Sequence, residues 1–127
     1  MPSSSTTVTS RRQKEIVEEY IVELDKHIAQ LKAGEIDKAL EIRDFAQLLH
    51  LHPAHLSNTV NEVTGRSACD FYEERMVKIS KELLLTTKLS ISQIAIQLTY
   101  DPSNFTKFFK HYVGMTPKKF RETQGTT

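Results

Sequence analysis

The chain has 127 residues, 39% of them hydrophobic, which suits a single domain with one modest core. Its formal net charge is only +1, but residues 1–64 hold seven Lys or Arg against ten Asp or Glu (−3), whereas residues 65–127 hold ten against six (+4). No apolar run approaches the roughly 20 residues that cross a membrane, so no membrane partner is expected. Residues 1–10 lack the basic start and apolar core of a signal peptide, so we expect a disordered tail and a cytoplasmic protein.

Residues 11–36 form the first predicted element, an amphipathic helix from Arg11 to about Lys32 that Gly34 is placed to end. Its apolar stripe comprises Ile16, Tyr20, Ile21, Leu24, Ile28 and Leu31. The later turns are expected in the core, and the early turns are expected to be surplus. The spacing of the stripe also permits a weak homodimer through this helix, although sustained heptads are missing. A remnant of a linker to a sensor domain is another interpretation.

Residues 37–66 are predicted to form a first helix-turn-helix unit. Its first helix runs from Ala39 to Leu49, its turn covers residues 50–52, and Pro53 starts the second helix, because proline is favoured at the first helical position. His50, His52 and His55 lie close together in sequence and suggest a metal site. Turn geometry and capping explain the first two histidines better, and the single Cys69 supplies no further ligand pair, so no metal is expected.

Residues 67–88 follow as a connecting helix, which Ser67 can cap. Its buried stripe is expected to be Phe71 or Tyr72, followed by Met76, Ile79 and Leu83.

Residues 89–122 contain the second predicted helix-turn-helix unit and a final helix. Ser90 and Gln93 form a capping pattern for a helix that ends near Leu98, and a three-residue turn leads to Asp101, which can cap the next helix at Pro102. The buried stripe of that next helix is predicted to be Phe105, Phe109 and Tyr112, with Phe108 beside it. The final helix starts at Pro117, and residues 123–127 are expected to form a tail.

The two units are an internal duplication with a shift of 49 residues and no gap. The shift places apolar, proline and glycine positions of one unit on like positions of the other. The pairs are Ile42 and Ile91, Phe45 and Ile94, Ala46 and Ala95, Leu49 and Leu98, Pro53 and Pro102, Leu56 and Phe105, Val60 and Phe109, and Gly65 and Gly114. A two-repeat helical stack is the alternative, but such arrays usually need three or more repeats.

The second unit resembles the signature of the AraC/XylS family of bacterial transcription regulators. The matching residues are Ile94, Ala95, Phe105, Phe109, Lys110, Gly114, Thr116, Pro117, Phe120 and Arg121. The resemblance covers about Leu40 to Arg121 and implies an all-α fold in which a long central helix bridges two helix-turn-helix units. It also implies binding to double-stranded promoter DNA, recruitment of RNA polymerase and a close-packed Ser80, where alanine is usual. The family has glycine in each turn where this chain has His50 and Thr99, so either the turn takes another geometry or packing absorbs the strain of a positive φ.

Matching residue by residue to the family assigns two groups of DNA contacts. Base edges are expected to meet Ala54, Ser57, Asn58 and Asn61 in the first unit and Ser103, Asn104, Thr106 and Lys107 in the second. Phosphates are expected to meet Lys110, His111, Lys118 and Lys119.

Other classes of function find less support in the sequence. No group of residues forms a catalytic constellation, and no phosphate loop is present, so neither an enzyme nor a cofactor is expected. The first recognition helix has no Lys or Arg, which favours one alternative: a helical protein-interaction module that keeps the fold with weak or no specific DNA binding.

Overall fold

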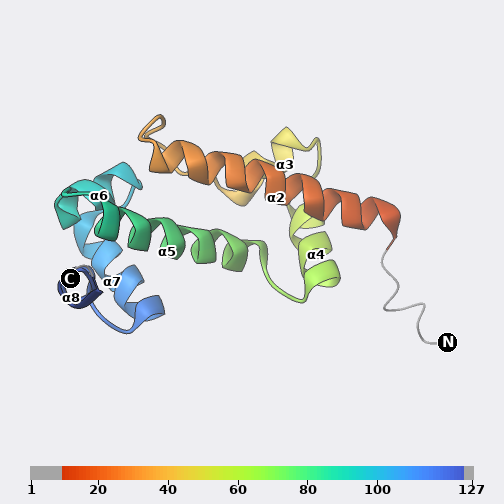
Figure 1. The fold of residues 1–127 in the computed structure, drawn as a ribbon. Helices are drawn as coiled ribbons and strands as arrows, with labels where there is room; N and C mark the ends of the chain where they lie inside the picture. Colours follow the sequence, from red (N-terminus) through yellow and green to blue (C-terminus); the bar gives the residue numbers. More distant parts are fainter. Residues whose placement is uncertain (1–9, 125–127) are drawn as a thin grey trace. The chain divides into compact units, whose positions relative to one another are not determined.

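The computed structural model describes residues 10–124, and all regular structure within this range is helical. The helices are α2 (Arg11–Lys32), α3 (Ile42–Leu48), α4 (Pro53–Thr64), α5 (Ala68–Thr86), α6 (Ile91–Gln97), α7 (Pro102–Val113) and α8 (Pro117–Gln124) (Figure 1). This confirms the predicted all-α fold with two helix-turn-helix pairs, α3–α4 and α6–α7. The expected tails at residues 1–10 and 123–127 lie mostly outside the described residues, although Thr123 and Gln124 still belong to α8.

The described chain divides into two compact units. Unit 1 contains residues 10–26 and 40–72, with the first part of α2, all of α3 and α4 and the start of α5. Unit 2 contains residues 27–39 and 73–124, with the remainder of α2 and α5 and all of α6, α7 and α8. Each unit buries an apolar core of its own. Each unit also contains one helix-turn-helix pair, α3–α4 in unit 1 and α6–α7 in unit 2.

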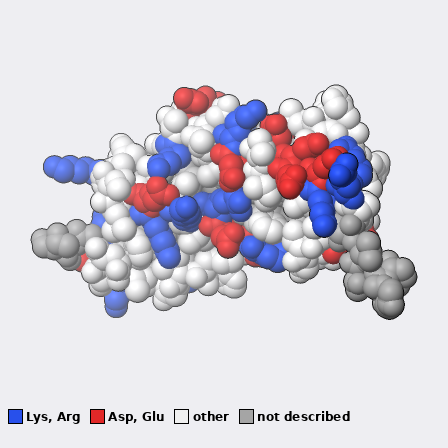
Figure 2. Space-filling view, turned by 45° about the vertical axis from the view of Figure 1, so that its right-hand side comes forward, with Lys and Arg blue, Asp and Glu red and all other residues white. Residues whose placement is uncertain are grey.

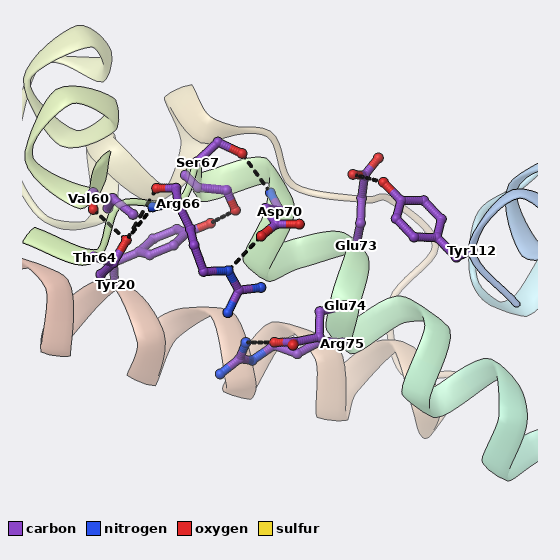
Figure 3. Close-up of polar contacts among 11 residues, drawn as sticks. Tyr20, Val60, Thr64, Arg66, Ser67, Asp70, Glu73, Glu74, Arg75 and Tyr112 are labelled. Atoms are coloured by element: carbon purple, nitrogen blue, oxygen red, sulfur yellow. Dashed lines mark hydrogen bonds and ion pairs between the residues drawn. The ribbon is translucent and has the colours of Figure 1, made fainter. Parts of the chain in front are cut away.

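The early turns of α2 belong to the core of unit 1, so the prediction that they are surplus is wrong. Ile16 is 1% exposed and Tyr20 is 2% exposed. The Tyr20 ring meets the Phe45 ring edge-on at 5.5 Å, and its hydroxyl donates a 3.0 Å hydrogen bond to the Ala68 carbonyl (Figure 3). These contacts satisfy the buried hydroxyl and bury the ring, which leaves little of this stripe for a partner.

The core of unit 2 is built on α6 and α7. Ala95 of α6 is fully buried, as expected for a small residue where two helices approach closely. Phe105 and Phe109 of α7 are also fully buried, and Phe109 packs edge-on against Phe120 of α8 at 5.4 Å. The aromatic side chains of α7 therefore hold both α6 and α8 in place.

Tyr112 does not extend this buried stripe, and its predicted burial is wrong. It is 44% exposed, and its hydroxyl bonds to the carboxylate of Glu73 in α5 (Figure 3). Its ring lies 5.1 Å from Phe108, which in turn stacks on Tyr100. The position is on the edge of the apolar stripe, where a tyrosine keeps its ring packed and its polar end near solvent.

Ser80 of α5 is fully buried within unit 2, as the family resemblance predicted. Its hydroxyl donates a 2.6 Å hydrogen bond to the Met76 carbonyl one turn earlier in the same helix. The polar atom is therefore satisfied within α5, and the small side chain keeps the space beside the helix narrow.

Arg121 ties α8 to the end of α5 rather than offering a free charge. Its guanidinium donates to the carbonyls of Leu84, Thr87 and Leu89 at 2.9, 3.3 and 2.7 Å. The last carbonyls of a helix lack intrahelical partners and carry partial negative charge. The cation therefore satisfies and stabilises the C-terminal end of α5.

Candidate nucleic-acid interface

The turns of the two units close through the same hydrogen bonds, 49 residues apart. In unit 1 the Leu51 N–H donates to the Ala46 carbonyl at 2.8 Å, and in unit 2 the Tyr100 N–H donates to the Ala95 carbonyl at 2.8 Å. The bonds from His50 to Gln47 and from Thr99 to Ile96 also correspond, at 3.1 and 2.9 Å. The duplication seen in the sequence is therefore a duplication of backbone geometry.

Both turns place a residue other than glycine in the left-handed region. The backbone φ is 59° at His50 and 69° at Thr99. Of the two possibilities that the sequence left open, the structure shows the positive φ rather than another turn geometry. The hydrogen bonds on either side hold this conformation, which costs about 1 kcal/mol or more per residue.

A side-chain cap starts α4 and α7, which are the expected recognition helices of the two units, but the caps differ in chemistry. His52 caps α4 by accepting the Ala54 N–H at Nδ1 over 3.1 Å. Asp101 caps α7 by accepting the N–H groups of Ser103 and Asn104 at 3.1 and 3.3 Å. The Ser103 hydroxyl, which lies 2.7 Å from the Asp101 carboxylate, is the main cause of a lowered pKa for Asp101. His52 thus serves as a helix cap.

The two recognition helices also end alike, with a left-handed glycine. Gly65 has φ 76° and follows α4, whereas Gly114 has φ 90° and follows α7. In each case the glycine N–H donates to the carbonyl four residues earlier, Asn61 at 2.8 Å and Lys110 at 2.9 Å. Each recognition helix therefore has 12 residues with fixed ends.

On α4, three of the four residues expected to meet bases are exposed. Ala54, Asn58 and Asn61 face solvent, whereas Ser57 is half-buried and lines a cavity within unit 1. No Lys or Arg occurs on this helix, and Glu62 is exposed near its end. The reading face of α4 is therefore composed of neutral amides and small side chains.

On α7, Ser103, Asn104 and Lys107 are exposed and Thr106 is half-buried. Ser103 differs from the others because its hydroxyl already donates to the Asp101 carboxylate. The sequence Asp-Pro-Ser predicts the aspartate cap, but the bond from the serine hydroxyl was missed. This face has an amide, a hydroxyl and a cation within about one and a half turns of helix.

A helix-turn-helix domain model matches residues 45–123, which is more than half of the chain and includes both recognition helices. The chain belongs to the AraC/XylS family of transcription regulators. Proteins of this AraC-type fold are DNA-binding regulators rather than enzymes.

Three AraC-type proteins illustrate the match. The transcriptional activator AarP of Providencia stuartii is 25% identical over 122 residues, which cover 95% of this chain and 84% of AarP. The C-terminal domain of AraT, a response regulator from Geobacillus stearothermophilus, has a TM-score of 0.77 at 27% identity and covers 94% of this chain and 90% of that domain. The DNA-binding domain of AdpA, solved in complex with a target DNA, shares the fold with a TM-score of 0.69 at 15% identity, over 84% of this chain and 90% of that one.

Several other AraC-type regulators are much longer than this chain. The chain spans only 27%, 31% and 35% of the lengths of three such relatives. No helix in residues 10–124 has the length and apolar character needed to cross a membrane.

The expected phosphate contacts of this AraC-type domain lie around the end of α7 and the start of α8. Lys110 and His111 are exposed in the last turn of α7, and Lys118 and Lys119 are exposed in the first turn of α8. The Thr116 hydroxyl accepts the Lys119 N–H at 3.1 Å and so caps the helix that carries both lysines. On the face drawn in Figure 2, basic side chains lie among acidic ones instead of forming one continuous positive surface. The cations around α7 are thus local groups on a chain of nearly neutral charge.

Proposed function

We propose that the protein binds a specific sequence of double-stranded promoter DNA, with α4 and α7 entering successive major-groove segments about 34 Å apart on one face of the duplex. The observation that carries this proposal is the repeated turn: both units end their first helix, turn and start their second helix through the same hydrogen bonds. Such a turn presents the exposed face of the second helix to a groove. A duplicated unit within one chain suits an asymmetric site.

The proposed base readers on α4 are Ala54, Ser57, Asn58 and Asn61. Asn58 and Asn61 suit adenine, because an amide can donate to N7 and accept from the N6 amino group together. Ala54 suits the methyl group of thymine. Ser57 is the weakest of the four, since it is half-buried within unit 1.

The proposed base readers on α7 are Ser103, Asn104, Thr106 and Lys107. Lys107 suits the O6 and N7 acceptors of guanine, and Asn104 suits adenine. Thr106 can serve a polar base edge or a thymine methyl group. Ser103 can still accept a hydrogen bond while it donates to Asp101.

Lys110, His111, Lys118 and Lys119 are proposed to contact phosphates. All four are exposed, and they are close in sequence to the end of α7 and the start of α8. Such contacts fix the register of the protein on the duplex without reading the bases.

We further propose that the protein is an activator that binds as a monomer and helps to recruit RNA polymerase. The likeness to AarP, whose name describes it as a transcriptional activator, supports activation. Burial of Ile16 and Tyr20 within unit 1 supports a monomer, because these two residues of the α2 stripe pack inside the chain. Recruitment of polymerase rests on the family alone.

The proposal is tested by selecting sequences from a randomised duplex library and then titrating the selected duplex and a scrambled one at several salt concentrations. The expected result is one selected sequence with two separate preferred segments, bound more tightly than the scrambled duplex. Affinity should fall steeply with salt for both duplexes, because bound cations release counterions from DNA. Little binding at low salt would instead favour the protein-interaction module. A single selected segment would show that only one unit reads bases.

A further inference from the structure

Unit 1 contains a cavity of about 380 Å³ behind the recognition helix α4. The walls come from four helices and from the connections before α3 and before α5. They consist of Tyr20, Leu40, Glu41, Ile42, Phe45, Ser57, Ser67, Ala68, Cys69 and Tyr72. Cavities of this size with mostly apolar walls and a few polar groups are typical of sites for small organic molecules.

The two units differ at equivalent positions beside this cavity. With the shift of 49 residues, Tyr72 corresponds to Arg121 and Leu40 corresponds to Leu89. In unit 2 a hydrogen bond joins the two residues, because the Arg121 guanidinium donates to the Leu89 carbonyl at 2.7 Å. In unit 1 a tyrosine stands at that position, and the cavity opens between it and Leu40.

The wall chemistry defines the ligand. Three aromatic rings, those of Tyr20, Phe45 and Tyr72, border the cavity and offer faces and edges for stacking. Glu41 is the only carboxylate or cation among the wall residues, and burial raises the pKa of Tyr72 to about 12, so that phenol stays neutral. Arg43 lies outside the wall and already pairs with the Glu41 carboxylate at 3.2 Å. An anion would therefore meet a carboxylate whose cation is engaged, and the wall itself offers no other cation.

We propose that this cavity is a binding site for a small, uncharged aromatic molecule that carries a hydroxyl or similar hydrogen-bond donor. The rings of unit 1 hold its aromatic plane, and its donor is directed to Glu41 or to the hydroxyls of Ser57 and Ser67. Ser57 connects the site to DNA reading, because it lines the cavity and precedes Asn58 on the exposed face of α4. The ligand thereby contacts the recognition helix of unit 1 from the side opposite to the groove.

The test uses 2-naphthol as the neutral probe and 2-naphthoate as the matched anion, each titrated into the full chain and followed by two-dimensional amide NMR. We expect saturable shifts for 2-naphthol at Ser57, Cys69 and Tyr72. The corresponding amides of unit 2, at Thr106, Lys118 and Arg121, serve as the internal control and should shift little. Shifts of equal size in both units, shifts that do not saturate, or equal binding of 2-naphthoate would overturn the proposal.

Two variants fill the cavity from different walls, and each has a control at the equivalent position of unit 2. Cys69→Phe and Ser57→Leu should each raise the dissociation constant for 2-naphthol by roughly tenfold or more. Lys118→Phe and Thr106→Leu should leave it unchanged. Cys69 is exposed, so its variant is expected to remain folded, which the unfolding midpoint verifies. Unchanged affinity in both cavity variants would refute the site, and because no DNA is present, that result would leave the proposed DNA binding intact.

Discussion

His50 and Thr99 occupy equivalent positions in the two turns, and both have a left-handed backbone, with φ of 59° and 69°. The two residues do not accommodate this conformation equally. Histidine is among the residues found there more often than average, whereas a β-branched threonine is a real outlier. Unit 2 therefore carries more strain in its turn than unit 1.

Thr99→Gly should raise the free energy of unfolding by about 1 kcal/mol, because glycine adopts a positive φ without a clash. His50→Gly should give a smaller gain. Urea denaturation of both variants measures the difference. Gly114→Ala is the opposite control: a methyl group there meets no atom within 4 Å, so its destabilisation reports the φ of 90° alone. A lower free energy of unfolding for Thr99→Gly would contradict this prediction. It would show that contacts of the threonine side chain stabilise the fold by more than the positive φ destabilises it.

Asp101 should make the stability of α7 depend on pH in the acid range. Its pKa is lowered from an ordinary value of 3.8, mainly by the Ser103 hydroxyl and then by the Asn104 N–H. A carboxyl whose pKa is lower in the folded state stabilises that state above its unfolded pKa, and this stabilisation is lost as pH falls through the folded value. Asp101→Asn keeps a capping oxygen but does not titrate. The difference in unfolding free energy between wild type and Asp101→Asn should be constant near neutral pH and should shift against wild type below about pH 4. A constant difference down to pH 2 would contradict the prediction.

Ser80 should tolerate loss of its hydroxyl but not added volume. Ser80→Ala removes a bond that the side chain makes to its own helix, so it should be neutral or slightly stabilising. Ser80→Leu places three more carbons at a fully buried site and should cost about 1 to 3 kcal/mol. Urea midpoints compare the two variants, and equal midpoints would mean that the site has room for the larger side chain.

Arg121 should contribute to the stability of the fold rather than to the affinity for DNA. Arg121→Gln loses the cation that bonds the carbonyls of Leu84, Thr87 and Leu89, and should cost about 2 kcal/mol of unfolding free energy. Lys118→Gln, on an exposed turn of the same helix, should change stability little. Thermal unfolding separates the two variants. Equal unfolding midpoints would indicate that the carbonyls are satisfied as well by water.

The DNA-binding variants should fail in different ways. Lys110→Ala removes a proposed phosphate contact, so it should weaken binding to all duplexes alike and reduce the slope of log affinity against log salt by about one. Asn58→Ala should weaken the free energy of binding to the selected sequence alone by about 1 to 3 kcal/mol and should leave the salt slope unchanged. Lys107→Ala should do both, because its ammonium is charged and is proposed to reach base edges. Repeating the library selection with each variant measures the change. An unaltered selected sequence for Asn58→Ala would assign unit 1 a purely supporting role.

Local signals in the sequence were enough to predict the helices and the turns. The end of α2 followed from Gly34, whose φ is 72°, and the start of α6 followed from Ser90 and Gln93, whose side chains bond each other's backbone N–H groups. Caps and periodicity act between neighbours three or four residues apart, so one sequence suffices to see them. The proposed base contacts, in contrast, remain predictions.

Contacts between distant segments could not be predicted in the same way. The bond from Tyr20 to Ala68 joins residues 48 positions apart, and nothing in the periodicity of α2 distinguishes a stripe packed within the chain from one left for a partner. The role of Arg121 could not be predicted, because its carbonyl partners belong to the backbone and leave no trace in the sequence. Tyr72 lines the cavity of unit 1 at the position equivalent to Arg121, and no local pattern in the sequence indicates this cavity.

The matched hydrogen bonds of the two turns have a consequence for engineering. Each recognition helix follows a turn closed by the same hydrogen bonds and ends at a left-handed glycine. The solvent-facing residues of each helix can therefore be exchanged without changing the turn before it or the glycine after it. A chain in which the exposed residues of α7 replace those of α4 keeps every residue of both turns. Such a chimera is expected to prefer a DNA site in which the same short base sequence occurs twice as a direct repeat. The same fold would then bind a direct repeat instead of an asymmetric site.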